Sequence, residues 1–251
     1  MRTLAVIPAR LGATRLPRKP LRLLAGLPLV VRVWERVVAM NLFDQVVIAT
    51  DSEEVASACS GRGAAVALTG WYDSGTERIA GMFLHEGYAA DYDVVVNVQG
   101  DEPFVSRFAL LGALRMVTDS RYEMGTAAVL APPAVLDDPN VVKVVTDERG
   151  RAMYFSRAPI PFLRDRADAA VQRSLVYQHI GVYAYSMDLL LRWSSIPISP
   201  LERIERLEQL RALSAGVSIG VALLDEPVRP GIDTEADLDR ANQEWTAFTT
   251  G

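Results

Sequence analysis

The sequence predicts an α/β fold: a mostly parallel sheet with helices on both faces and an inserted antiparallel lobe. Short apolar runs alternate with amphipathic segments along the first half of the chain, a pattern typical of parallel sheets covered by helices. Residues 94–98 form a continuous apolar run, as a central parallel strand does. Residues 141–145 and 152–155 flank Asp147-Glu148-Arg149-Gly150, which is a hairpin signal.

The elements of the first half follow from periodicity and from residues typical of helix ends. Strands are expected at residues 4–7, 46–49, 64–68 and 94–98. A helix is expected at about 28–40, where Pro28 suits the first turn. A second helix opens in the acidic stretch 51–54, and a third begins at Ser74 and ends at Gly87.

The second half contains fewer clear signals. A loop is expected at residues 158–173 because this stretch contains two prolines and several charges. Strands are expected at 180–185 and 217–224, and a long helix at 201–214 with Gly216 as its stop. A final helix opens at Asp233-Thr234, with Thr234 as its cap. We expect one domain, residues 1–251, with the smaller lobe at about 140–190.

Composition excludes several classes of protein. The net charge of −5 argues against a general nucleic-acid binder, and no apolar run is long enough to span a membrane. The single cysteine, Cys59, cannot form an internal disulfide and is expected to be a buried residue of a helix. Together with the absence of a signal peptide, these features predict a cytoplasmic protein.

Basic residues are concentrated in one early segment. They are Arg10, Arg15, Arg18, Lys19 and Arg22. The segment follows the first strand, where open α/β sheets bind ligands, and its cations suit phosphate oxygens. It lacks the glycines of a Walker loop or a dinucleotide fingerprint, which disfavours a dehydrogenase. A solvated basic loop is the alternative.

Lys19 and Lys143 are the only lysines in an arginine-rich chain, which suggests a need for a compact ammonium.

Acidic residues suggest a metal site. Asp101 directly follows the apolar strand and is placed to hold Mg²⁺, whereas Glu102 is the weaker candidate and an ordinary acidic turn is the alternative. Asp233 is a second candidate ligand, but the start of a helix explains it as easily. The Ser74-to-Arg78 segment could bind an anion, but a plain helix start explains it as easily too. The two histidines, His85 and His179, lack the spacing of zinc ligands, and no nucleophile motif of a covalent hydrolase occurs.

Taken together, these segments resemble the 3-deoxy-manno-octulosonate (Kdo) cytidylyltransferase family, also called CMP-Kdo synthetases. The resemblance rests on Val6-Ile7-Pro8-Ala9-Arg10, Thr14-Arg15-Leu16-Pro17, Lys19-Pro20, Ser74-Gly75-Thr76-Glu77-Arg78, Val96-Asn97-Val98-Gln99-Gly100-Asp101-Glu102-Pro103, Tyr154-Phe155-Ser156-Arg157, Ser199-Pro200-Leu201-Glu202, Leu207-Glu208-Gln209-Leu210-Arg211 and Asp233-Thr234. The motifs occur in order and run almost from end to end of the chain.

The resemblance implies a Rossmann-like nucleotidyltransferase fold and the reaction of CTP with Kdo to give CMP-Kdo and pyrophosphate. It also implies a Mg²⁺ requirement, a homodimer, and a role in lipopolysaccharide synthesis. The alternatives are a cytidylyltransferase for sialic acid or an 8-amino Kdo analogue, a transferase acting on a sugar 1-phosphate, and a non-catalytic nucleotide-binding protein of the same fold.

The resemblance also implies roles for individual residues. The catalytic group would be Lys19, Asp101 and Asp233, of which both acids would ligate Mg²⁺. The nucleotide would lie near Pro8, Ala9, Arg10, Arg15, Lys19, Ser74, Gly75 and Arg78. The sugar would contact Gln99, Arg157, His179, Tyr183, Tyr185, Glu208 and Gln209. The fork of Arg157 suits the sugar carboxylate.

The sequence departs from the family pattern at two places. Arg18 stands where the family commonly has glycine, which adopts a positive φ more readily. Trp71-Tyr72-Asp73 precedes Ser74 where the family often has His-Gln.

Overall fold

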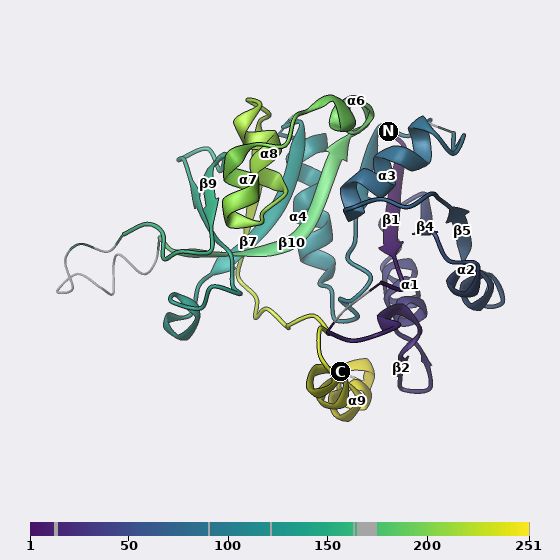
Figure 1. The fold of residues 1–251 in the computed structure, drawn as a ribbon. Coiled ribbons are helices and arrows are strands. Elements are labelled where there is room, and N and C mark those ends of the chain that lie inside the picture. Colours follow the sequence, from purple (N-terminus) through teal and green to yellow (C-terminus); the bar gives the residue numbers. More distant parts are fainter. Residues whose placement is uncertain (13–14, 90, 121, 163, 165–174, 251) are drawn as a thin grey trace. The chain divides into compact units, whose positions relative to one another are not determined.

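A computed structural model describes residues 1–12, 15–89, 91–120, 122–162, 164 and 175–250 (Figure 1). The chain forms two compact units: unit 1 is Met1–Arg107 with Arg229–Gly251, and unit 2 is Phe108–Val228. Each unit is described separately below, and the expected single domain with a lobe at about 140–190 stays a prediction. Thr14 and most of the predicted loop at 158–173 lie outside the described residues.

Unit 1 contains a parallel sheet. Its strands are β1 (Thr3–Ala9), β4 (Gln45–Thr50), β5 (Ala65–Leu68) and β6 (Val94–Asn97). They pair in the order β5-β4-β1-β6, with every pairing parallel. All four strands were predicted, with bounds that differ by one or two residues. The apolar runs identify them because both faces of a parallel sheet are covered.

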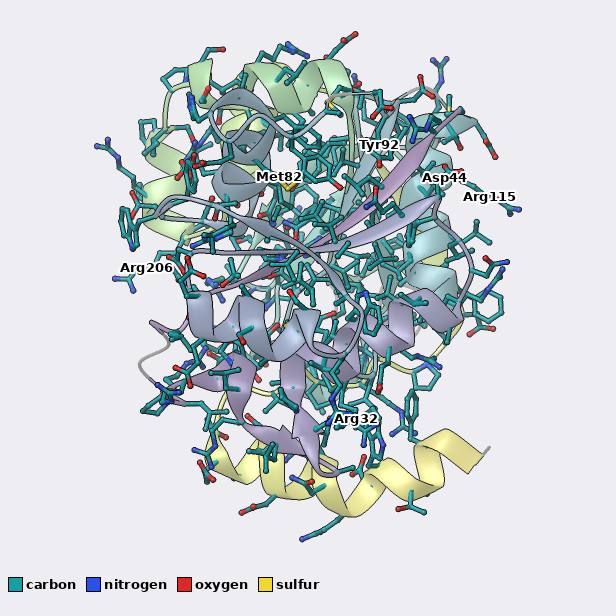
Figure 2. All side chains as sticks on the ribbon, turned by 90° about the vertical axis from the view of Figure 1, so that its right-hand side faces the viewer. Arg32, Asp44, Met82, Tyr92, Arg115 and Arg206 are labelled. Carbon is teal, nitrogen blue, oxygen red and sulfur yellow. The ribbon has the colours of Figure 1, made fainter. Side chains whose placement is uncertain are left out.

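The helices between these strands fix a crevice. They are α1 (Leu29–Ala39), α2 (Glu53–Ser60) and α3 (Gly75–Leu84). The chain moves from β1 to β4 to β5, then reverses to β6. Right-handed crossovers therefore place α1 and α2 on one face and α3 on the other, as Figures 1 and 2 show. The reversal creates a switch point between β1 and β6, where ligands bind in open sheets.

Serine and threonine side chains cap three of the helices of unit 1. Ser52 Oγ accepts from Val55 N at 3.3 Å, and Ser74 Oγ accepts from Glu77 N at 3.1 Å. Thr234 Oγ1 accepts from Asp237 N at 3.2 Å ahead of α9 (Glu235–Thr250), which confirms the predicted cap. Two predicted bounds were wrong. Pro28 precedes α1 rather than lying in its first turn, and α3 ends at Leu84, before Gly87.

The basic segment packs against the end of the chain. It contains a short 3-10 helix, η1 (Lys19–Leu21), and leads into a small antiparallel ribbon of β2 (Leu23–Leu24) and β3 (Leu27–Pro28). Leu16, Leu24 and Leu29 share an apolar cluster with Ile232, Leu238 and Ala241. Burial of these side chains fixes the loop after β1 against the start of α9.

Unit 2 contains a mixed sheet. Its strands are β7 (Met124–Leu130), β8 (Lys143–Thr146), β9 (Ala152–Ser156), β10 (Tyr177–Ser186) and β11 (Ile219–Leu224). β7 pairs in parallel with β11 and antiparallel with β10, and β8 is antiparallel to both β9 and β10. The predicted hairpin is confirmed as β8 and β9. β10 begins earlier than predicted, so His179 lies within a strand rather than before one.

Two of the longer elements of unit 2 have no counterpart among the predictions. They are α4 (Arg107–Thr118) and β7. The signal for α4 was present, because Ala109, Leu110, Ala113, Leu114 and Val117 follow helical spacing and are buried. A Cβ at Gly125 would lie 2.1 Å from the Ala113 carbonyl oxygen, so glycine lets β7 touch α4. The remaining short helices are η2 (Pro133–Val135), α6 (Met187–Arg192) and η4 (Trp193–Ser195).

The predicted helix at 201–214 is wrong. The structure has α7 (Pro200–Glu205) and α8 (Gln209–Ser214), separated at Arg206, which is left-handed with φ 54°. Arg206 points away from the protein in Figure 2. Arg211 bridges the break, because its Nε and Nη2 donate to the Glu202 carboxylate at 2.9 and 2.8 Å. The apolar period continued across the break, which is why the sequence suggested one helix.

Two further expectations concern single features. Cys59 is buried in α2, as predicted, and burial raises the pKa of its thiol to about 11. Within the described chain, no helix combines the length and apolar character needed to cross a bilayer.

Candidate active site

A cavity of about 420 Å³ opens in unit 1 where the loops after β1 and β6 leave the sheet. Its lining includes every predicted nucleotide residue together with Gln99, Asp101 and Asp233. Further lining comes from Gly12, Leu16, Pro20, Tyr72 and Gly100. Four of the lining side chains are basic and two are acidic, so the cavity suits a ligand with several negative charges. The structure therefore brings together segments that are far apart in the sequence.

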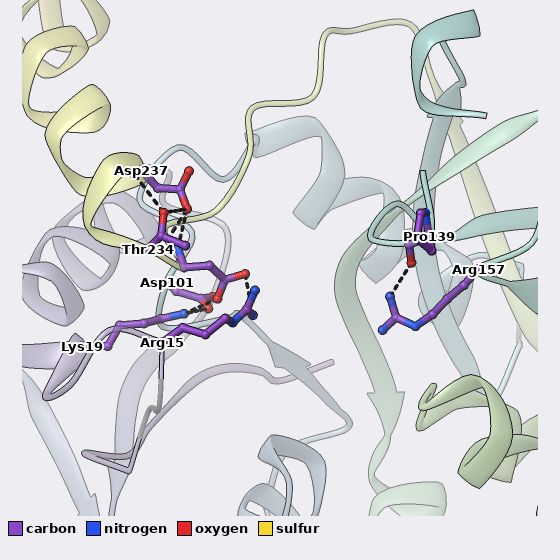
Figure 3. Close-up of polar contacts among 8 residues, drawn as sticks. Arg15, Lys19, Asp101, Pro139, Arg157, Thr234 and Asp237 are labelled. Atoms are coloured by element: carbon purple, nitrogen blue, oxygen red, sulfur yellow. Dashed lines mark hydrogen bonds and ion pairs between the residues drawn. The ribbon is translucent and has the colours of Figure 1, made fainter. Parts of the chain in front are cut away.

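The central contact is between Lys19 and two acids. Its ammonium donates to the carboxylates of Asp101 and Asp233, the latter at 2.8 Å (Figure 3). Arg15 adds an ion pair of 3.0 Å to Asp233. Burial alone would lower the pKa of Lys19, but the charges and hydrogen bonds of Asp101 and Asp233 outweigh it and raise the pKa above its ordinary value. Lys19 is thus a permanent cation in this cavity.

Asp233 is available for chemistry because it does not cap α9. Thr234 is the cap, and Asp237 accepts from the backbone N–H of Asp233 and Thr234 at 3.2 and 2.9 Å. The loops of the two acids also touch, since Ile232 N donates to Asp101 O at 2.9 Å. These bonds fix the two carboxylates at one place, and the helix-start explanation of Asp233 is no longer needed.

Glycines allow the loops of the cavity to approach closely. A Cβ at Gly100 would lie 2.8 Å from the backbone oxygen of Pro8, and one at Gly75 would lie 3.1 Å from the Pro8 ring. Gly75 also begins α3, directly after the cap Ser74. On the rim, Arg10 Nη1 donates to the carbonyl of Asp73 at 3.0 Å. The first residues of α3 are therefore held against the end of β1.

Arg78 is buried beside the cavity and is only 2% exposed. Its guanidinium donates to Asp51 at 2.9 Å, to Thr69 Oγ1 at 2.5 Å and to Gly70 O at 3.1 Å. These contacts join α3 to the ends of β4 and β5. Arg78 therefore stabilises the packing of α3 against these strand ends. Its contact with the nucleotide stays a prediction.

The two departures from the family pattern have clear structural consequences. Arg18 adopts φ 58° and ψ 31°, the left-handed conformation that glycine would favour, and its side chain pairs with Glu54. Tyr72 lies in the cavity wall, where its ring occupies the space of a Cβ at Gly81. Arg18 thus adopts a backbone conformation that glycine takes more readily.

The donor set fits a hard divalent cation. Asp101 and Asp233 offer carboxylate oxygens at one point, and Mg²⁺ is typically held by one or two carboxylates plus phosphate oxygens and water. Among the described residues, no group of three or more His, Cys, Asp or Glu could hold a metal ion. A metal here would therefore complete its coordination with water or with the phosphates of a ligand.

Comparison with known proteins decides the family. A cytidylyltransferase family model matches residues 4–219. The 3-deoxy-manno-octulosonate cytidylyltransferase of Gemmatimonas aurantiaca is 56% identical over 246 residues, which cover 98% of this chain and 95% of the relative. The protein of the same name from Leptothrix cholodnii is 45% identical, over 96% of this chain and 90% of the relative.

The chain belongs to the 3-deoxy-manno-octulosonate cytidylyltransferase family. A solved structure of CMP:2-keto-3-deoxy-manno-octonic acid synthetase complexed with CTP has a TM-score of 0.89 and 33% identity, and the match covers 98% of this chain and 99% of that one. The 4-diphosphocytidyl-2C-methyl-D-erythritol synthase of Anaerococcus prevotii shares the fold alone, with a TM-score of 0.65 and 14% identity. The predicted family and the Rossmann-like nucleotidyltransferase fold are confirmed.

The sugar residues expected of a family member are divided between the two units. Gln99 lines the cavity of unit 1. Arg157, His179, Tyr183, Tyr185, Glu208 and Gln209 belong to unit 2. Arg157 follows β9, where Glu205 and Pro139 hold it. Its Nε donates to Glu205 O at 2.9 Å. Its Nη1 donates to Pro139 O, also at 2.9 Å (Figure 3).

Three of these residues form an aromatic row along β10. The ring centroids of His179 and Tyr183 are 5.3 Å apart, and those of Tyr183 and Tyr185 are 6.2 Å apart. Tyr185 is itself buried and meets Trp193 edge-on at 5.7 Å, so it supports the row from the core. His179 and Tyr183 are only partly buried, so their rings and polar atoms suit contact with a sugar ring.

His179 is neutral, and the contacts around it indicate its tautomer. Burial lowers the pKa of its imidazole from 6.5 to about 3. Its Nε2 lies 2.8 Å from Thr126 Oγ1, which in turn lies 2.7 Å from the carbonyl oxygen of Val182. The Thr126 hydroxyl has a single proton, and the carbonyl must receive it. His179 therefore donates from Nε2 and keeps Nδ1 as an acceptor.

Gln209 is a buried residue with an incomplete set of hydrogen bonds. It is 4% exposed at the start of α8, and its Nε2 has no hydrogen-bond partner among the described residues. A buried amide that lacks a partner costs free energy unless a ligand or water supplies one. This supports the predicted polar role of Gln209, while the role of its neighbour Glu208 stays a prediction.

Sequence reasoning missed two residues of the site. Tyr72 was noted only as a departure from the family pattern, although its ring forms part of the cavity wall. Glu205 was not considered, although it accepts from Arg157 N at 2.9 Å and from Ser156 Oγ at 2.6 Å. Nothing in the local sequence identified Glu205, because its partners are almost fifty positions away.

Proposed function

We propose that this chain transfers the CMP group of CTP to the anomeric hydroxyl of Kdo, releasing pyrophosphate, as a step of lipopolysaccharide synthesis. The observation that carries the proposal is the placement of Lys19 between Asp101 and Asp233 in a cavity rich in cations. Membership of the family and the likeness to a synthetase complexed with CTP support the choice of substrates.

The residues of the cavity act by positioning the substrates. Arg10, Arg15 and Lys19 would hold the triphosphate and neutralise the charge that moves to the leaving pyrophosphate. The sugar hydroxyl attacks the α-phosphorus in line. A new phosphorus–oxygen bond forms to the sugar, the bond to the β-phosphate oxygen breaks, and the hydroxyl proton passes to solvent. No side chain is assigned as a general base.

We propose Mg²⁺ as the cofactor, held by Asp101 and Asp233. When bound, Mg²⁺ neutralises phosphate charge and lowers the pKa of a coordinated hydroxyl. The contribution of the chain is to present both carboxylates at one point through Thr234, Asp237 and Ile232. Because Lys19 shares the same carboxylates, its ammonium must give up part of that contact when the metal arrives.

The sugar would be recognised by polar groups of unit 2. Arg157 suits the carboxylate, because a guanidinium can donate two parallel hydrogen bonds. His179 supplies an acceptor at Nδ1, and Gln209 supplies a buried donor. These groups favour an acidic, polyhydroxylated sugar. Sialic acid and an 8-amino Kdo analogue share this chemistry and are the alternatives to be tested.

We further propose a homodimer in the cytoplasm. Ile198, Leu201 and Ile204 are 47%, 42% and 78% exposed, an apolar surface that a second copy could cover. Light scattering on wild type and Ile204→Glu tests this. A wild-type dimer that the substitution dissociates supports it, and a wild-type monomer contradicts it. The buried free Cys59 is compatible with a reducing compartment.

Product identity tests the proposed reaction. The purified protein, CTP, Mg²⁺ and Kdo should yield a CMP ester and pyrophosphate, seen as new signals by ³¹P NMR. Release of CDP with a phosphorylated sugar would contradict the site of attack. A CMP ester formed with N-acetylneuraminate and not with Kdo would keep the chemistry but change the sugar.

A further inference from the structure

Lys143 is a fully buried lysine whose ammonium is surrounded by backbone carbonyls. It donates to Asp138 O at 2.9 Å, to Val141 O at 2.6 Å and to Arg157 O at 2.6 Å. An ammonium has three N–H donors, so every one of them is used. Burial lowers the pKa of Lys143 below its ordinary value, although Asp138 and Asp137 oppose that effect.

The three carbonyls connect two parts of unit 2. Residues 138–141 form the turn before β8, and Arg157 follows β9. The same turn also receives the side chain of Arg157, whose Nη1 donates to Pro139 O at 2.9 Å (Figure 3). Lys143 therefore fixes both the turn that accepts from the Arg157 guanidinium and the backbone from which that side chain extends.

Glu205 holds Arg157 from another element. It accepts from the Arg157 backbone N–H at 2.9 Å, and its carbonyl accepts from Nε at 2.9 Å. With Nε and one N–H of Nη1 engaged, the Nη2 group of Arg157 has no hydrogen-bond partner among the described residues. The guanidinium is thus held through Nε and one N–H of Nη1, and its Nη2 side is the open edge that can donate to a carboxylate.

We propose that Lys143 is a positioning residue for the acceptor sugar: it orients Arg157 so that the open edge of the guanidinium meets the sugar carboxylate. This inference rests on the proposed function and on the role of Arg157 within it. Arginine at position 143 would not orient Arg157 equally well, because a planar guanidinium does not fit three carbonyls that converge on one nitrogen. The only other lysine, Lys19, likewise meets two acceptors with one nitrogen.

A double-mutant cycle tests the inference. Lys143→Met keeps most of the length of the side chain and removes the donors. It should lower kcat/KM for Kdo about tenfold or more while the KM for CTP changes less than about twofold. In an Arg157→Met background, Lys143→Met should have almost no further effect on kcat/KM for Kdo, because a positioning residue acts through its partner.

A matched control lies on the same hairpin. Arg151 is 60% exposed and pairs with Asp147, and Arg151→Met should leave both KM values unchanged. Equal and additive losses in both backgrounds would overturn the inference, and so would a matching rise of both KM values. If Lys143→Met does not fold, as judged by thermal unfolding, Lys143→Arg is carried through the same cycle with the same expectation. Absence of turnover in the wild type would instead overturn the proposed function.

Discussion

Lys19 Nζ and Asp233 Oδ1 lie 2.8 Å apart although 214 positions separate them in the chain. The same ammonium contacts Asp101, so one lysine joins the loop after β1, the loop after β6 and the start of α9. The cluster places a cation where the proposed metal would bind. Lys19 and a divalent ion should therefore compete for the two carboxylates.

Replacing Lys19 should expose this competition. Lys19→Met removes the ammonium, so the nucleotide-free protein should bind Mg²⁺ about tenfold more tightly or better, because one adjacent charge shifts a carboxylate equilibrium by about this much. Isothermal titration calorimetry measures it. Arg22→Met is the control, since Arg22 pairs with Glu235 and does not line the cavity. Weaker or unchanged Mg²⁺ binding by Lys19→Met would contradict the account.

Substitution by alanine should have different effects on stability and on the KM for CTP at two glycines of the cavity. A Cβ at Gly100 would meet the Pro8 backbone oxygen at 2.8 Å, whereas a Cβ at Gly12 would meet nothing within 4 Å. Gly100→Ala should lose about 1–3 kcal/mol of stability and raise the KM for CTP, because the loops after β1 and β6 must separate. Gly12→Ala should change neither by much. Denaturant unfolding and steady-state kinetics measure both, and equal effects would argue against the close approach.

Arg18 should behave unlike an ordinary surface residue. Both Arg18→Gly and Arg18→Ala lose the exposed pair with Glu54, which is worth about 0–1 kcal/mol. Alanine keeps the left-handed strain of about 1–2 kcal/mol, whereas glycine relieves it and adds an entropy cost of about 0.5–1 kcal/mol. The glycine variant should therefore be the more stable one, by up to about 1.5 kcal/mol in chemical denaturation. A more stable alanine variant would show that this backbone carries no strain.

His179 should make stability depend on pH. Its folded pKa of about 3 lies below the unfolded value of 6.5, so the unfolded chain binds one more proton between these limits. The contribution to stability is complete above pH 6.5 and falls as the pH approaches 3, by up to about 1.4 kcal/mol per unit. Compared with His179→Gln, the wild type should lose stability more steeply on acidification from 6.5. Parallel curves for the two proteins would contradict the neutral, buried imidazole.

Much of unit 1 could be predicted from sequence because its signals are local. Each strand is a short apolar run. Three helices are preceded by capping residues that the sequence shows, namely Ser52, Ser74 and Thr234. The position of the cavity also follows from the sequence, since ligands bind at the carboxyl ends of strands. What the local pattern could not show is that Asp233 lies beside Asp101. That depends on the contact between the loop of Asp101 and the segment before α9, where Ile232 N donates to Asp101 O.

Unit 2 was predicted less well because its contacts are distant. The break at Arg206 depends on the Glu202–Arg211 ion pair and on a left-handed residue, neither of which interrupts the apolar period. The strand β7 is rich in small residues and was not identified. The environment of Arg157 depends on Glu205, Pro139 and Lys143, which approach from separate segments. The rarity of lysine singled out Lys143, but no local signal linked it to Arg157.

The most direct test of the central claim is pyrophosphate release measured with each of four nucleoside triphosphates and with Kdo or N-acetylneuraminate, in the presence of Mg²⁺. The account predicts release only with CTP and Kdo. It also predicts that Asp101→Asn lowers kcat by about a hundredfold or more, because charge stabilisation at the reacting phosphate is lost. Absence of release with every pair, or full Mg²⁺-dependent activity of Asp101→Asn, would contradict it.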